Sequence, residues 1–237
     1  MKLVSVSILA LFLASFTNPV LANPTGTRVA GQVTFNGSVA KLKALDLSKE
    51  PVCAKIHAAE PLYPEALLVG PGNSLRNVVI YVSAGAPPSG PAPASPILFD
   101  QVDCHYATHV AVLRVGQEVQ ISNSDPLSHN IHPLAKVNRE WNKIQPPGTP
   151  AFSYAYESPE FIPVKCNIHS WMSGYFAVLN TSFFAITGED GHFTLPELPP
   201  GHYTLTAWHE MLGTQTREIT IGPGGEAQTV NFTFSKP

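Results

Sequence analysis

The chain has 237 residues, which is enough for one large domain or two modest ones. Its formal net charge is −3 and it has no run of basic residues, so nucleic acid is not an expected partner. Charged residues make up only 13% of the chain, which holds 17 glycines and 23 prolines. This balance favours short strands joined by turns, and we predict an all-β fold.

Residues 1–22 have the features of a secretory signal peptide. Lys2 supplies the positive start, the stretch up to Phe16 is largely apolar, and Val20-Leu21-Ala22 fits the cleavage position. The apolar run is short for a membrane-spanning helix and is interrupted by serines. We therefore expect cleavage after Ala22, no membrane span in the mature protein, and a location in the periplasm or otherwise outside the cell.

The next segments predict strands and one long loop. Residues 27–39 predict a strand pair or a bent strand, because residues 29–35 alternate between apolar and polar side chains and Asn36-Gly37 is a turn signal. Residues 78–82 are rich in β-branched side chains and predict a buried strand. Residues 85–96 are rich in Pro, Ala, Ser and Gly, which excludes a helix or an inner strand. We expect an exposed loop within a domain, with a linker between two domains as the alternative.

Strands are also predicted at residues 109–115 and 118–122, before a turn at residues 123–126 that places His129 just past a strand end. After residue 180 short alternating strands follow at regular intervals, with Asp190-Gly191 among the turns. This pattern is typical of a small antiparallel sandwich. We place the domain boundary there, which gives domains at residues 23–180 and 181–237.

A group of candidate metal ligands lies between two predicted strands. Cys166, His169 and Met172 have the spacing C-x2-H-x2-M. A lone cysteine or methionine is most often part of a hydrophobic core, but thiolate, imidazole and thioether together are ligands that copper prefers. A blue-copper site needs a second histidine, either His129 or His132. Positions three apart on a strand point to opposite faces, so we expect only one of these to reach the ion.

The other cysteines, Cys53 and Cys104, form a pair if Cys166 is kept as a metal ligand. Export permits disulfides, and a bridge closing this long loop would stabilise the protein by roughly 4 kcal/mol. The alternative is a second metal site, formed by these two cysteines together with His57, His105 and His109.

These motifs resemble known families. Cys166, His169 and Met172, with His129 and Asn130 upstream, resemble the copper loops of cupredoxins, and the short ligand loop looks most like that of amicyanin. The resemblance implies His129 as the first copper ligand, Met172 as the weak axial ligand, and an asparagine after the first histidine that ties the two copper loops together.

The end of the chain resembles a second module. Residues 188–191, 198–201 and 207–210 are similar to the carboxypeptidase-regulatory-like sandwich, whose relatives include carbohydrate-binding-like folds. The whole chain looks like periplasmic proteins labelled methylamine-utilisation or plastocyanin-like. This resemblance implies a Greek-key cupredoxin sandwich followed by a small antiparallel β-sandwich.

We therefore predict an exported type 1 copper protein that carries single electrons between redox partner proteins. Asn130 and Trp171 are expected beside the metal. Cys166 and His169 could also act as nucleophile and base, but no orienting acid or oxyanion motif accompanies them, so we do not expect an enzyme. Two alternatives stay open: a cell-envelope module that binds protein or carbohydrate, and a copper storage or delivery protein. We make no prediction of the oligomeric state.

Overall fold

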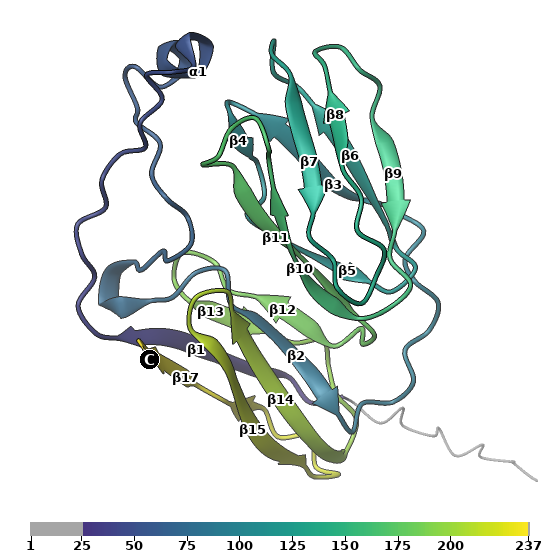
Figure 1. Cartoon of the computed structure of the whole chain (residues 1–237). Coiled ribbons are helices and arrows are strands. Elements are labelled where there is room, and N and C mark those ends of the chain that lie inside the picture. Colours follow the sequence, from purple (N-terminus) through teal and green to yellow (C-terminus); the bar gives the residue numbers. More distant parts are fainter. Residues whose placement is uncertain (1–25, 237) are drawn as a thin grey trace, which may run out of the picture.

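The computed structural model describes residues 26–236 (Figure 1). The predicted signal peptide at residues 1–22 lies outside this range. The described part is built almost entirely of strands, with one short α-helix, α1 (Pro51–Ile56), and one 3-10 turn, η1 (Pro71–Asn73). The predicted all-β fold is thus confirmed. No helix in residues 26–236 is both long enough and apolar enough to cross a membrane.

The first sandwich occupies the middle of the chain. Its strands are β3 (Ile97–Val102), β4 (His105–Tyr106), β5 (Val110–Arg114), β6 (Glu118–Asn123), β7 (His129–Pro133), β8 (Lys143–Gln145), β9 (Phe152–Ala155), β10 (Glu160–Lys165) and β11 (Ser173–Leu179). One sheet has the order β5-β11-β10-β7-β8 and the other β4-β3-β6-β9. Side chains alternate between the faces of a strand, so Phe99, Ile121 and Phe176 meet, fully buried, between the two sheets.

The second sandwich combines both ends of the described chain. Its strands are β1 (Val29–Asn36), β2 (Val79–Ala84), β12 (Phe184–Ile186), β13 (His192–Thr194), β14 (Gly201–His209), β15 (Gly213–Ile221), β16 (Gln228–Thr229) and β17 (Phe232–Ser235). One sheet has the order β12-β2-β14-β15, and in the other β1 pairs with β13, β16 and β17. Val33, Ile80 and Leu205 lie in the core between these sheets with no exposed surface.

This pairing differs from the predicted division at residue 180, because β1 and β2 lie before that residue and pair with strands that follow it. Alternation in a sequence reveals a strand and its buried face, but not the strand that it pairs with. Residues 85–96, which we expected to be a loop within one domain, run from β2 of the second sandwich to β3 of the first. They are therefore a linker between the two sandwiches.

The sandwiches pack against each other through a shared apolar layer. Val79, Val110 and Ala177 are buried there, and the Phe161 ring stacks on the Trp208 ring with 4.2 Å between centroids. Val79 belongs to the second sandwich, whereas Val110 and Ala177 belong to the first. The outer face of the β5-β11-β10 sheet is thus covered by the sheet that contains β2 and β14.

The long segment between β1 and β2 covers one end of the first sandwich. We call its residues 45–62, which include α1, the capping segment; Figure 1 shows α1 beyond the same end of the sandwich as β4 and the start of β7. A disulfide joins Cys53 of α1 to Cys104 in the turn between β3 and β4. Leu47 is buried with these cysteines, and Trp171 packs against the same cluster.

Candidate metal centre

The candidate ligands come from two neighbouring strand ends of the first sandwich. His129 is the first residue of β7, and Cys166 follows directly after β10. β10 pairs with β11 in an antiparallel hairpin whose last partners are Lys165 and Ser173, so residues 166–172 form the connecting loop. Within this loop the Cys166 amide donates to the Met172 carbonyl at 3.1 Å. The loop thereby folds back on itself and keeps its side chains together.

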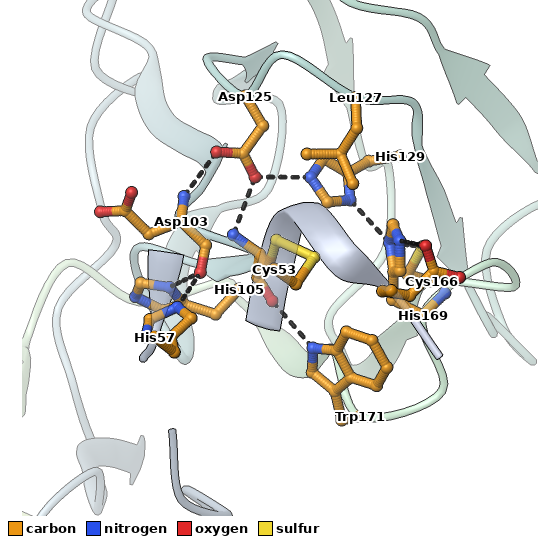
Figure 2. The surroundings of a disulfide bond; sticks show 12 residues. Cys53, His57, Asp103, His105, Asp125, Leu127, His129, Cys166, His169 and Trp171 are labelled. Carbon is orange, nitrogen blue, oxygen red and sulfur yellow. Dashed lines mark hydrogen bonds and ion pairs between the residues drawn. A yellow bond between two sulfur atoms is a disulfide. The ribbon is translucent and has the colours of Figure 1, made fainter. Parts of the chain in front are cut away.

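The structure brings His129, Cys166 and His169 into one buried group. Their potential ligand atoms all lie within 4.8 Å of one another. His129 Nδ1 is 3.0 Å from His169 Nδ1, and Cys166 Sγ is 3.8 Å from the same atom (Figure 2). The exposed fractions of the three residues are 0%, 3% and 1%.

This donor set fits a copper ion. A metal-bound imidazole nitrogen lies about 2.0 Å, and a thiolate about 2.3 Å, from an ion such as zinc, which allows two donors on one ion to be roughly 4 Å apart. The two separations from His169 Nδ1, 3.0 Å to His129 Nδ1 and 3.8 Å to Cys166 Sγ, are below this limit. Two imidazoles and one thiolate form the trigonal set of blue-copper sites. Burial, together with the neighbouring His129, lowers the pKa of His169, which favours the neutral imidazole that a metal requires.

Asp125 orients the first histidine. Its Oδ2 lies 2.6 Å from His129 Nε2, on the side of the ring away from His169. The same carboxylate accepts hydrogen bonds from the backbone amides of Asp103 and Cys104, at 2.6 and 2.8 Å. These two residues have positive φ angles of 52° and 57°, so Asp125 also holds the turn that carries the disulfide. A proton on Nε2, donated to Asp125, leaves Nδ1 free for a metal.

Asn130 joins the two segments that carry the ligands. Its Oδ1 accepts a hydrogen bond of 3.0 Å from the Asn167 amide, and its side-chain amide donates to Asn142 Oδ1. This is the tie between the loops that the cupredoxin resemblance implies. His132 does not belong to the group of His129, Cys166 and His169, because its Nε2 contacts Glu140 Oε1 at 2.8 Å and its Nδ1 faces the Asn167 side chain.

The structure places Met172 and Trp171 next to the group. Met172 is 1% exposed and belongs to the same core cluster as Cys166. The Trp171 ring lies 5.2 Å from the His169 ring, and its Nε1 donates to the Cys104 carbonyl at 2.9 Å. Both residues line a cavity of about 220 Å³, which the capping-segment residues Leu45 and Leu62 also line.

The cysteines and histidines of the alternative second metal site have other partners. Cys53 and Cys104 form the disulfide. His57 Nε2 and His105 Nδ1 both donate to the Asp103 carbonyl, at 2.7 and 3.2 Å. His109 bonds to Glu210 through Nε2. Within residues 26–236, only His129, Cys166 and His169 form a cluster of His, Cys, Asp or Glu side chains suited to a metal.

Sequence reasoning missed two acidic residues beside the group. From the sequence alone, Asp125 is predicted only as part of a turn. Its position four residues before His129 is a signal that could have indicated a contact between the two side chains. Glu50 carries no such signal. Its Oε2 lies 3.9 Å from His169 Nε2, and only the fold of the capping segment brings it there.

Comparisons with known proteins find one family model and several structural neighbours. Residues 177–235 match the model of the carboxypeptidase regulatory-like domain. Among solved structures, a mutant of amicyanin with Cu(I) is 23% identical, with a TM-score of 0.32 and coverage of 40% of this chain and 98% of that one. A reduced amicyanin mutant is 22% identical, with a TM-score of 0.33 and the same coverage.

A more distant likeness is to the copper-containing nitrite reductase of Thermus scotoductus, at 18% identity and a TM-score of 0.34, covering 42% of this chain and 25% of that one. No curated protein matches the chain in sequence. The candidate ligands are therefore assigned from the donor atoms of this chain alone.

Proposed function

We propose that the protein holds one copper ion on His129, Cys166 and His169 and carries single electrons between redox partner proteins. Met172 is the weak axial ligand in this proposal, and the protein is an exported carrier rather than an enzyme. The observation that supports it most is the buried group of two imidazoles and one thiol on the ends of adjacent strands. That set combines the ligand types of an electron-transfer site.

The surroundings of the group suit a carrier. When bound, copper supplies a one-electron couple between Cu(II) and Cu(I). The protein's part is to keep the same ligand positions in both states, which the hydrogen bonds of Asn130 and Asp125 and the disulfide favour. The capping segment and the burial of all three donors exclude water from the group. Catalytic metal sites instead keep a position open to substrate.

The ligand assignment is tested by adding Cu(II) to the protein and to single-residue variants. We expect the unaltered protein to take up one equivalent and to develop an intense visible band from charge transfer between thiolate and copper. Cys166→Ser should remove the band, because a hydroxyl is not a soft charge-transfer ligand. His132→Ala is the matched control and should leave the band in place, since His132 contacts Glu140 and not the group.

Two results would contradict the proposal. If Cys166→Ser keeps the visible band, the thiolate is not a ligand. If the unaltered protein stays colourless and binds copper only weakly, Cys166 is a core thiol and the cell-envelope binding module becomes the better account. Fast exchange of copper with a chelator, combined with irreversible reduction, would instead indicate storage or delivery.

A further inference from the structure

The two candidate histidine ligands are flanked by carboxylates in the same way. Their Nδ1 atoms face each other at 3.0 Å, and each Nε2 faces an acidic side chain. For His129 that side chain is Asp125, with its Oδ2 at 2.6 Å. For His169 it is Glu50, with its Oε2 at 3.9 Å. A buried pair of imidazoles thus lies between two negative charges that come from different parts of the chain.

His169 Nε2 needs a hydrogen-bond partner. The atom is buried and forms no hydrogen bond within the described residues, although buried polar atoms are nearly always paired. Glu50 is the acidic residue that faces it. The glutamate side chain is 37% exposed and therefore has room to rotate, and a hydrogen bond would need the 3.9 Å separation to shorten to about 3 Å.

The backbone holds Glu50 in this place. Its amide donates to the Leu47 carbonyl, and its own carbonyl accepts from the Ala54 amide, each at 2.9 Å. Cys53, three residues further on, is fixed to the turn at Cys104 by the disulfide. Asp125 holds that turn by accepting a hydrogen bond from the Cys104 amide. The two carboxylates are therefore parts of one connected frame around the histidine pair.

We propose that Asp125 and Glu50 are positioning residues that favour the oxidised state of the copper centre. Each accepts the Nε2 proton of one histidine, which directs the Nδ1 lone pair toward the ion. With neutral imidazoles, the Cys166 thiolate and the two carboxylates together bring three negative charges to the group. Such charges attract Cu(II) more strongly than Cu(I), and most strongly where water is excluded. The inference rests on the proposed copper function.

The decisive variant is Glu50→Gln, which keeps a hydrogen-bond acceptor for His169 Nε2 but removes the charge. We expect the preference of the site for Cu(II) over Cu(I) to fall about threefold, which raises the reduction potential by about 28 mV at 59 mV per tenfold change. Asp125→Asn should raise it further, because Asp125 is 3% exposed and less screened by water. Since Asp125 also holds the Cys104 turn, Glu50→Gln carries the test if the Asp125 variant fails to fold.

Glu140→Gln is the matched control. It removes one negative charge from a similar carboxylate–histidine contact, in which Glu140 lies 2.8 Å from His132. Neither residue belongs to the group of His129, Cys166 and His169. Its potential should stay at that of the unaltered protein. A second readout is the pair of imidazole ¹⁵N signals in the diamagnetic Cu(I) protein. Both rings should carry their proton on Nε2, and Glu50→Ala should speed exchange of the His169 proton with water.

The outcomes separate this inference from the copper proposal. If the visible band is present but Glu50→Gln shifts the potential no more than Glu140→Gln does, the positioning role is wrong and the copper proposal stands. An Nδ1 proton on either ring of the Cu(I) protein also overturns the role. If no copper binds, both proposals fail together.

Discussion

At the scale of single residues, the candidate centre depends on polar side chains that each perform two tasks. Asp125 holds the His129 ring and the turn at Cys104, and Asn130 joins β7 to the loop that carries Cys166. Most of these contacts are buried, where a lost partner is costly because water cannot replace it. The three donors are thus held in place by the protein alone, which would keep reorganisation small in the proposed copper site.

Asn130→Ala tests this view without any metal. The change leaves the Asn167 amide without its 3.0 Å acceptor in a partly buried position. We expect the free energy of unfolding of the copper-free protein to fall by about 1–3 kcal/mol. Urea denaturation measures it, with Asn180→Ala, at an exposed position, as the matched control. Equal stability of the two variants would mean that the loop does not depend on Asn130.

Some residues of the site could be predicted from the sequence and others could not. The spacing of Cys166, His169 and Met172 placed them in one loop between two strands, and they do lie between β10 and β11. Asn130 could be assigned to the loop contact only through the family resemblance. Glu50 could not be found at all, because its approach to His169 depends on the path of a segment that has no regular structure apart from α1.

At the scale of elements, the capping segment connects one end of the first sandwich to the candidate site. It contributes α1, the disulfide partner Cys53 and the Glu50 carboxylate, which lies 3.9 Å from the buried His169. Its buried cluster is small, with Leu47 and Cys53 of the segment packed against Cys104 of the first sandwich. A segment with so few buried apolar side chains has little cohesion of its own, so the disulfide should provide much of its stability.

Replacing both cysteines, in Cys53→Ala/Cys104→Ala, should lower the free energy of unfolding by about 4 kcal/mol for a bridge that spans 51 residues. The double change avoids a new free thiol that would compete with Cys166 for copper. Denaturant titration measures the loss, and removal of bound copper by a chelator should become faster than in the unaltered protein. An unchanged rate of removal would show that the capping segment does not shield the group.

Strand existence was predictable at this scale, whereas strand pairing was not. The alternation in residues 29–35 and the β-branched run at 78–82 correctly indicated β1 and β2. Their partners, β13 and β14 among them, lie more than a hundred residues away in the chain. Nothing local in an alternating strand distinguishes a nearby partner from such a distant one, and this is why the predicted boundary at residue 180 differs from the observed pairing.

At the scale of the whole molecule, a buried ionic contact links the two sandwiches beside their apolar interface. His109, just before β5, bonds through Nε2 to Glu210, which follows β14. Its Nδ1 is 3.8 Å from Glu65. Burial by itself lowers the pKa of His109, but the hydrogen bond and charge of Glu210, with the charge of Glu65, outweigh it and raise the pKa above its usual value of 6.5.

This raised pKa gives the contact a definite pH dependence. A histidine whose pKa is higher in the folded protein contributes its full stabilisation below about pH 6.5 and loses it as the pH rises through the folded pKa. Glu210→Gln should therefore lower stability clearly at pH 6 and much less at pH 9. The neighbouring His209, whose pKa burial lowers to about 4, opposes folding in acid in both proteins.

Thermal denaturation across this pH range measures the difference. Glu218→Gln is the matched control, because Glu218 lies exposed on β15 of the same sandwich. A stability difference between the unaltered protein and Glu210→Gln that grows with pH would show that the contact does not depend on a protonated His109.

The central claim is a one-electron copper centre on His129, Cys166 and His169, and redox titration of the Cu(II)-loaded protein tests it most directly. Visible absorption and electron paramagnetic resonance should be followed together. We predict an intense thiolate-to-copper band and a narrow copper hyperfine splitting, both lost on addition of one electron per copper and both restored on reoxidation. A copper-loaded protein without that band, or one whose band does not return, would contradict the account.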